Sequence, residues 1–198
     1  MRPESPDPQD YLACNDVVDW TDPEVYDVAQ QIAGQRQGDI EISRALFEWV
    51  RDHIGHSVDI AAEVVTCSAS EVLSERTGLC YAKSHLLAAM LRSRGIPAGF
   101  CYQVLRKNEQ DTLLVLHGFN GIYLASRARW IRVDARGNTD DINAQFGIET
   151  EQLAFPVRPE LGEFTYETIF VTPAAGVVHA LRKYRRTSDL LRDVPNSL

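Results

Sequence analysis

The stretch of sequence that decides the fold is residues 76–98, which read RTGLCYAKSHLLAAMLRSRGIPA. Gly78 turns the chain toward a run of apolar residues that recur at helical spacing, and these predict a helix over residues 80–93. Apolar residues also fill the other sides of this run, so we expect the buried central helix of a domain. Pro97 prevents the helix from continuing.

Cys80 stands at the first turn of this helix. A thiol there lies at the positive end of the helix dipole, which favours the thiolate. A thiolate attacks a carbonyl far better than a thiol does. A cysteine at a helix start is more often just a small buried residue, so the catalytic hypothesis needs a base and an orienting group elsewhere in the chain.

Three strands are predicted after the helix, over residues 99–105, 113–124 and 130–134, with a polar turn at 108–111. Because helices precede strands, the sequence predicts an α+β domain with an antiparallel sheet. The helix that carries Cys80 is expected to pack on this sheet.

His117 and Asp134 lie on neighbouring predicted strands. If the turn between them is centred between Ala125 and Ser126, the two residues stand directly opposite, on one face, with Cβ atoms about 4.5–5.5 Å apart. A longer loop shifts this pairing by a residue or two. The spacing predicts a triad in which Cys80 is the nucleophile, His117 moves the proton and Asp134 orients the imidazole.

Further residues are candidates for binding the substrate. Backbone N–H groups at the start of the helix, with His56, are candidates for stabilising an oxyanion. Tyr81 and Gln103 are candidates for the substrate groove. His85 lies about 140° around the helix from Cys80, so we do not expect it to share the site.

Metal and cofactor sites are not predicted. His53, His56 and Asp59 lie close together in the sequence, but no cysteine or further histidine has matching local spacing for a metal. The four cysteines contain no C-x-x-C pair, which speaks against a disulfide framework and a zinc knuckle. No sequence motif indicates a cofactor.

Charge and composition narrow the class of partner. The 198-residue chain has a formal net charge of −8, which argues against nucleic acid or an anionic membrane as its partner. Residues 1–10 lack the features of a signal peptide, and no apolar run reaches the roughly 18 residues of a membrane span. We therefore expect a cytoplasmic protein acting on a peptide, protein or small amide; its oligomeric state stays open.

The remaining elements are predicted with less support from periodicity. We expect an irregular arm over residues 1–22 and one domain over 23–198, with a core at 40–140 and an extension at 141–198. The other predictions are a helix at 24–33, a helix capped by Asp39, a short helix capped by Ser68 or Ser70 with Glu71 placed after Ser68 as in a capping box, a helical turn at 149–153, a strand at 165–171 and a basic helix at 177–191.

The motif around Cys80 resembles that of the transglutaminase-like superfamily, in its bacterial-type form. The shared pattern is a glycine two residues before the cysteine, a helix rich in leucine and alanine, and the sequence Gly-Ile-Pro-Ala at residues 95–98. A histidine on a strand and an aspartate at the end of the next strand follow. The resemblance implies a papain-like core and cysteine chemistry on amide or ester carbonyls, with Cys80, His117 and Asp134 in the catalytic roles.

Two departures from the family pattern lie next to these residues. Gly118-Phe119 follows His117 where many members carry Ala-Trp, and Ala135-Arg136 follows Asp134 where many carry Pro-Thr. Neither departure removes a member of the predicted triad, but both change its surroundings.

The function we expect first is hydrolysis of an amide through a thioester on Cys80. The amide is a peptide bond or a glutamine-like side chain. A crosslinking enzyme must exclude water from the thioester, and the sequence contains no segment that we can assign to that task. Two alternatives stay open: transfer of the acyl group to a protein or small amine, and a peptide-binding module without catalysis.

Overall fold

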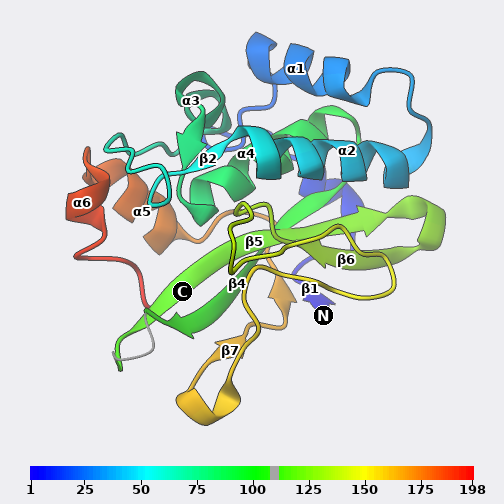
Figure 1. Cartoon of the computed structure of the whole chain (residues 1–198). Coiled ribbons are helices and arrows are strands. Elements are labelled where there is room, and N and C mark those ends of the chain that lie inside the picture. Colours follow the sequence, from blue (N-terminus) through cyan, green and yellow to red (C-terminus); the bar gives the residue numbers. More distant parts are fainter. Residues whose placement is uncertain (108–111) are drawn as a thin grey trace.

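The computed structural model describes residues 1–107 and 112–198, and it has the predicted α+β architecture. Helices α1 to α4 lie in the first half of the chain with the short strands β1, β2 and β3 among them, and the longer strands and helices α5 and α6 follow (Figure 1). The helices are α1 (Pro23–Ala33), α2 (Gly38–His53), α3 (Ala69–Glu75), α4 (Cys80–Ser93), α5 (Ala175–Lys183) and α6 (Thr187–Leu190).

The main sheet is antiparallel, with strand order β6-β5-β4-β7, and helices α1 to α4 gather on one side of it (Figure 1). Its strands are β4 (Ala98–Arg106), β5 (Leu114–Leu124), β6 (Arg129–Val133) and β7 (Phe164–Thr165). Two short parallel pairs complete the fold: β1 (Arg2–Pro3) with β8 (Thr168–Ile169), and β2 (Gly55–His56) with β3 (Thr77–Gly78). Short 3-10 helices are η1 (Pro8–Leu12), η2 (Ala125–Arg127) and η3 (Pro159–Leu161).

Helix α4 is the central helix, with the bounds that the sequence predicts. Every residue from Tyr81 to Arg92 is buried, because α1, α2 and α3 cover one side of the helix and β4 and β5 the other. Apolar contact therefore surrounds the helix and fixes the position of its first residue, Cys80.

The capping box before α3 is confirmed. The Ser68 hydroxyl accepts a hydrogen bond from the Glu71 N–H at 3.2 Å, and the Glu71 carboxylate accepts from the Ser68 N–H at 3.1 Å. These bonds satisfy two amide donors that have no partner within the helix, and so they define where α3 begins.

Several local predictions are wrong. Asp39 does not cap α2, since the helix begins at Gly38 and the Asp39 carboxylate accepts hydrogen bonds from Ser126 instead. No helical turn forms at 149–153, where Gln152 bridges to Gln145. The strand predicted at 165–171 is divided into β7 and β8, and the basic helix at 177–191 is divided into α5 and α6. The predicted turn at 108–111 lies outside the described residues.

The N-terminal residues are tied to the sheet. β1 pairs with β8, and the fully buried Tyr11 donates its hydroxyl to the Ile169 carbonyl at 3.0 Å. The division into an arm over 1–22 and a domain over 23–198 stays a prediction. Within the described residues, no helix has the length and apolar character needed to cross a membrane.

Candidate active site

His117 and Asp134 meet at the end of the β5–β6 hairpin. Nε2 of His117 donates to Oδ2 of Asp134 at 2.8 Å. The strands pair Asn120 with Val133, so continuing the ladder would place Asp134 opposite Phe119 rather than opposite His117. Direct opposition, the first form of the prediction, is therefore wrong by two residues, within the range allowed for a longer loop.

Asp134 is held by backbone donors as well as by the histidine. Its carboxylate accepts from the N–H groups of Arg136 and Ala154, each at 3.1 Å, and its side chain is 1% exposed. Burial alone would raise the pKa of this carboxyl, but His117 and the two backbone donors outweigh it and lower the pKa. Asp134 is thus kept as a carboxylate facing the imidazole.

Cys80 and His117 line one cleft of about 760 Å³. Because Nε2 of His117 is bonded to Asp134, Nδ1 is the ring nitrogen that remains for the Cys80 thiol. Burial lowers the pKa of His117, but the charges of Asp134 and Cys80 outweigh burial and raise it to about 10. The arrangement favours the charged imidazolium form of His117.

His56 lines the same cleft at the end of β2. Its side chain is 9% exposed, and its Nδ1 lies 3.7 Å from Asp59 Oδ1, too far for a hydrogen bond. Burial and the nearby Arg136 lower the pKa of His56 to about 3, so the ring is neutral. A neutral imidazole in a cleft can donate a hydrogen bond without supplying a charge.

The other predicted site residues lie in different surroundings. Tyr81 contributes to the lining of the cleft, but its ring is buried and its hydroxyl donates to the Leu116 carbonyl. Gln103 is outside the cleft lining and donates to the Phe155 carbonyl at 3.4 Å and to the Thr165 hydroxyl at 3.2 Å. Gln103 therefore supports the cleft wall that Phe155 forms, instead of lining the groove as expected.

His85 is excluded from the cleft, as expected. It is fully buried in the core, where its Nδ1 hydrogen-bonds to the Cys67 carbonyl at 2.7 Å.

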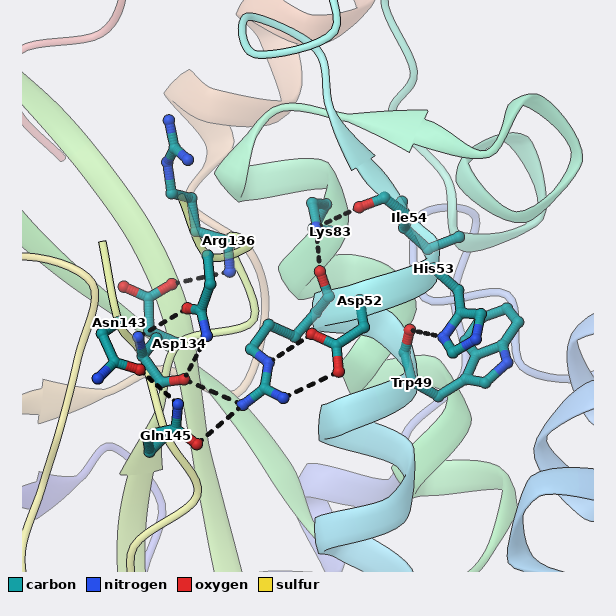
Figure 2. Close-up of polar contacts among 12 residues, drawn as sticks. Trp49, Asp52, His53, Ile54, Lys83, Asp134, Arg136, Asn143 and Gln145 are labelled. Atoms are coloured by element: carbon teal, nitrogen blue, oxygen red, sulfur yellow. Dashed lines mark hydrogen bonds and ion pairs between the residues drawn. The ribbon is translucent and has the colours of Figure 1, made fainter. Parts of the chain in front are cut away.

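Lys83 on α4 is fully buried, whereas a lysine on a helix is usually solvated. Its Nζ donates to the carbonyls of Ile54 and Arg51, which end α2 (Figure 2). Positive charge is favoured at the carboxyl end of a helix, because the last carbonyls have no partner within it. Burial nevertheless lowers the pKa of Lys83 to about 7. This contact joins α4 to the segment that leads into His56.

An ion pair connects two walls of the cleft. Arg136 follows β6, Asp59 follows β2, and the guanidinium holds the carboxylate with two hydrogen bonds, one of them 2.8 Å long. The sequence showed Arg136 only as a departure from the family pattern. Its partner Asp59 is 77 residues away in the chain, beyond the reach of local periodicity.

The side chains of residues 1–107 and 112–198 include no cluster of three or more His, Cys, Asp or Glu placed to bind an ion.

Comparisons with known proteins agree with the motif and the fold. A model of the transglutaminase-like superfamily matches residues 26–135. A candidate cysteine protease from Cytophaga hutchinsonii is 20% identical, with a TM-score of 0.55 over 67% of this chain and 43% of that chain. The periplasmic domain of TgpA from Pseudomonas aeruginosa is 18% identical, with a TM-score of 0.48 over 66% of this chain and 48% of that domain.

The matched part spans less than half the length of either of these two structures. A search of curated proteins found no match. At such low identity the structure from Cytophaga hutchinsonii supports the fold alone, whereas the family model covers more than half of the chain and contains Cys80, His117 and Asp134. The chain belongs to the transglutaminase-like superfamily.

Proposed function

We propose that the protein is a cysteine amide hydrolase in which Cys80, His117 and Asp134 form the catalytic triad. One observation carries the proposal. The 2.8 Å bond from Nε2 of His117 to Asp134 leaves Nδ1 for the Cys80 thiol, in a cleft that both residues line. This is the geometry that nucleophilic catalysis by a thiol needs.

In the first step the Cys80 thiolate attacks the amide carbonyl carbon. A C–S bond forms, the oxygen takes up negative charge, and the C–N bond then breaks as the His117 imidazolium gives its proton to the leaving amine. In the second step His117 takes a proton from water, which attacks the thioester. The acid leaves and Cys80 is regenerated as a thiolate paired with the imidazolium.

The oxyanion is stabilised by the start of α4. The N-cap residue Leu79 makes no side-chain cap, so the amides of the first turn are not used by a capping group. The neutral His56 provides a second donor from the facing wall of the cleft. In this proposal His56 acts as a hydrogen-bond donor, and not as an acid or a base.

Hydrolysis is favoured over transfer because Cys80 is partly exposed. Water can therefore reach a thioester formed there, and acyl transfer requires that water be kept away. A peptide, a protein or a small amide is the proposed substrate. We also propose a reducing compartment such as the cytoplasm, which suits four unpaired cysteines.

Trapping the thioester tests this function. The purified protein is incubated with glutaminyl and peptidyl amides, and an acyl adduct on Cys80 is sought by mass spectrometry after an acid quench. Hydroxylamine added to the reaction should convert part of the acid product into a hydroxamate. Cys80→Ala should give neither product nor adduct. Product formation by this variant, at the wild-type rate, would refute the proposal.

A further inference from the structure

On the edge of β5 next to His117, both backbone groups of Leu116 are already hydrogen-bonded within the protein. The Leu116 N–H donates to the Pro195 carbonyl at 2.7 Å, and the Leu116 carbonyl accepts from the Tyr81 hydroxyl. β6 pairs only with residues 120–124 of β5, so this part of the strand edge is not covered by the sheet itself. A segment distant in sequence covers it instead.

That segment, Leu191–Pro195, is called the strap here. Leu191 and Val194 line the cleft together with Cys80 and His117. The Leu191 carbonyl also accepts a hydrogen bond from Lys107 Nζ at 2.9 Å. The strap therefore bounds the cleft on the side where β4 ends and β5 begins.

The strap is fixed to the rest of the fold by contacts just before it and within it. Just before it, Leu190 is fully buried, and the Thr187 N–H donates to the Glu63 carbonyl at 2.8 Å. Within it, the Asp193 carboxylate accepts from Lys183 at 2.9 Å and from the Tyr184 hydroxyl at 2.6 Å. These contacts hold the strap against the cleft in this structure.

Extended peptides commonly bind proteins by adding a strand to an exposed sheet edge, where main-chain hydrogen bonds supply much of the affinity. At Leu116 both main-chain groups are already bonded, one of them to the strap. A peptide that continues through the cleft in both directions would have to displace Pro195 and pass the side chains of Leu191 and Val194.

We propose that the strap is a specificity-determining segment that closes one end of the cleft to a continuing peptide chain. The protein then acts on amides that can enter the cleft end-on. Such amides lie near an end of the substrate or on a side chain, whereas a peptide bond in the middle of a chain cannot enter in this way. The apolar lining residues suit an aliphatic arm leading to such an amide; they are Leu79, Leu105, Val115, Phe155 and Pro156. This inference rests on the proposed amide hydrolysis.

A pool of capped peptides about ten residues long tests the inference, with every hydrolysed bond mapped by mass spectrometry. For the wild type we expect cleavage within about two residues of an end, or deamidation of side chains. The strap variant Val194→Gly/Pro195→Gly should raise the ratio of internal to terminal hydrolysis about tenfold or more. Asn196→Gly/Ser197→Gly, the matched double-glycine control just beyond the strap, should leave this ratio unchanged.

Cleavage of internal bonds by the wild type as fast as terminal ones would overturn the role of the strap, while amide hydrolysis itself would stand. An unchanged ratio in the strap variant, in protein whose unfolding temperature shows that it is folded, would also overturn it. If the wild type hydrolyses no amide at all and Cys80 forms no adduct, the proposed function fails, and the inference fails with it.

Discussion

His117 Nε2 lies 2.8 Å from Asp134 Oδ2, although the hairpin register is two residues away from direct opposition. Side chains alternate between the faces of a strand with a period of two, so a shift of two residues keeps both side chains on one face. A shift of one residue would have separated them. The bond therefore tolerates the longer loop. The backbone N–H groups of Arg136 and Ala154 also donate to the Asp134 carboxylate and hold it in place.

Asp134→Asn should abolish most of the activity while the fold is kept. The amide has the size of the carboxyl group but no charge, so the pKa of His117 should fall from about 10 toward its usual value. We expect kcat/KM to drop about 10²–10⁴-fold. NMR titration of the His117 ring measures the change in pKa. Asp59→Asn is the control, because it removes a carboxylate of the same cleft that is not bonded to His117. The His117 pKa in this variant should stay within the wild-type range. An unchanged His117 pKa in Asp134→Asn would contradict the proposed role of Asp134.

The dependence of stability on pH should change in opposite directions in Lys83→Met and His117→Gln. Burial lowers the pKa of Lys83 from 10.5 to about 7, so between these values the unfolded chain holds one more proton, and Lys83 makes the fold more stable as pH rises. The pKa of His117 is raised from 6.5 to about 10, so its stabilisation is present below 6.5 and is lost as pH rises through 10.

Urea unfolding between pH 7 and 10 checks both signs. The free energy of unfolding of the wild type minus that of Lys83→Met should increase with pH, by roughly 1 kcal/mol per pH unit. The same difference for His117→Gln should decrease. If the two differences have the same sign of slope, at least one of the two environments is described wrongly.

Gly118→Ala should destabilise the fold. A Cβ at this position would lie 2.8 Å from Tyr81 Cδ1, and the Tyr81 ring is pinned by its hydroxyl bond to Leu116. This close approach explains why the chain carries glycine where many relatives carry alanine. We expect a loss of about 1–3 kcal/mol in the free energy of unfolding. Gly176→Ala in α5 is the matched control, because a Cβ there meets nothing within 4 Å. This change should be neutral or stabilising. Equal effects of the two changes on the free energy of unfolding would refute the explanation.

Ser68→Ala should cost about 1 kcal/mol of stability, because it removes the side-chain acceptor of the capping box that begins α3. Ser74→Ala, at an exposed position in the same helix, controls for the change in helix propensity. Denaturant unfolding measures both. A loss that is no greater in Ser68→Ala than in Ser74→Ala would show that the box does not contribute.

Local patterns in the sequence predicted α4 from Cys80 to Ser93 with its observed bounds, because the apolar residues that define the helix are the ones that its neighbours cover. The hairpin was predicted less well. Ala128 takes a positive φ of 49° in the loop between β5 and β6, a conformation that alanine rarely adopts and that its sequence does not signal. The longer loop then produces the offset of two residues.

The surroundings of the site could not be predicted from the sequence. Asp59 lines the cleft and bonds to Arg136, Ala154 bonds to Asp134, and Pro195 bonds to Leu116. These contacts between distant segments follow from the tertiary fold and not from local spacing. Lys83 was missed because a lysine on a helix is usually solvated, whereas here the end of α2 supplies carbonyl acceptors for it.

The reactivity of Cys80 with iodoacetamide near neutral pH tests the central claim most directly. Peptide mapping compares it with Cys14, which is exposed, and with Cys67 and Cys101, whose pKa values burial raises to about 11 and about 12. The account predicts that Cys80 reacts fastest in the wild type, and that His117→Ala slows Cys80 about tenfold or more without changing Cys14. Alkylation of Cys80 no faster than that of Cys14, with no effect of His117→Ala, would contradict the account.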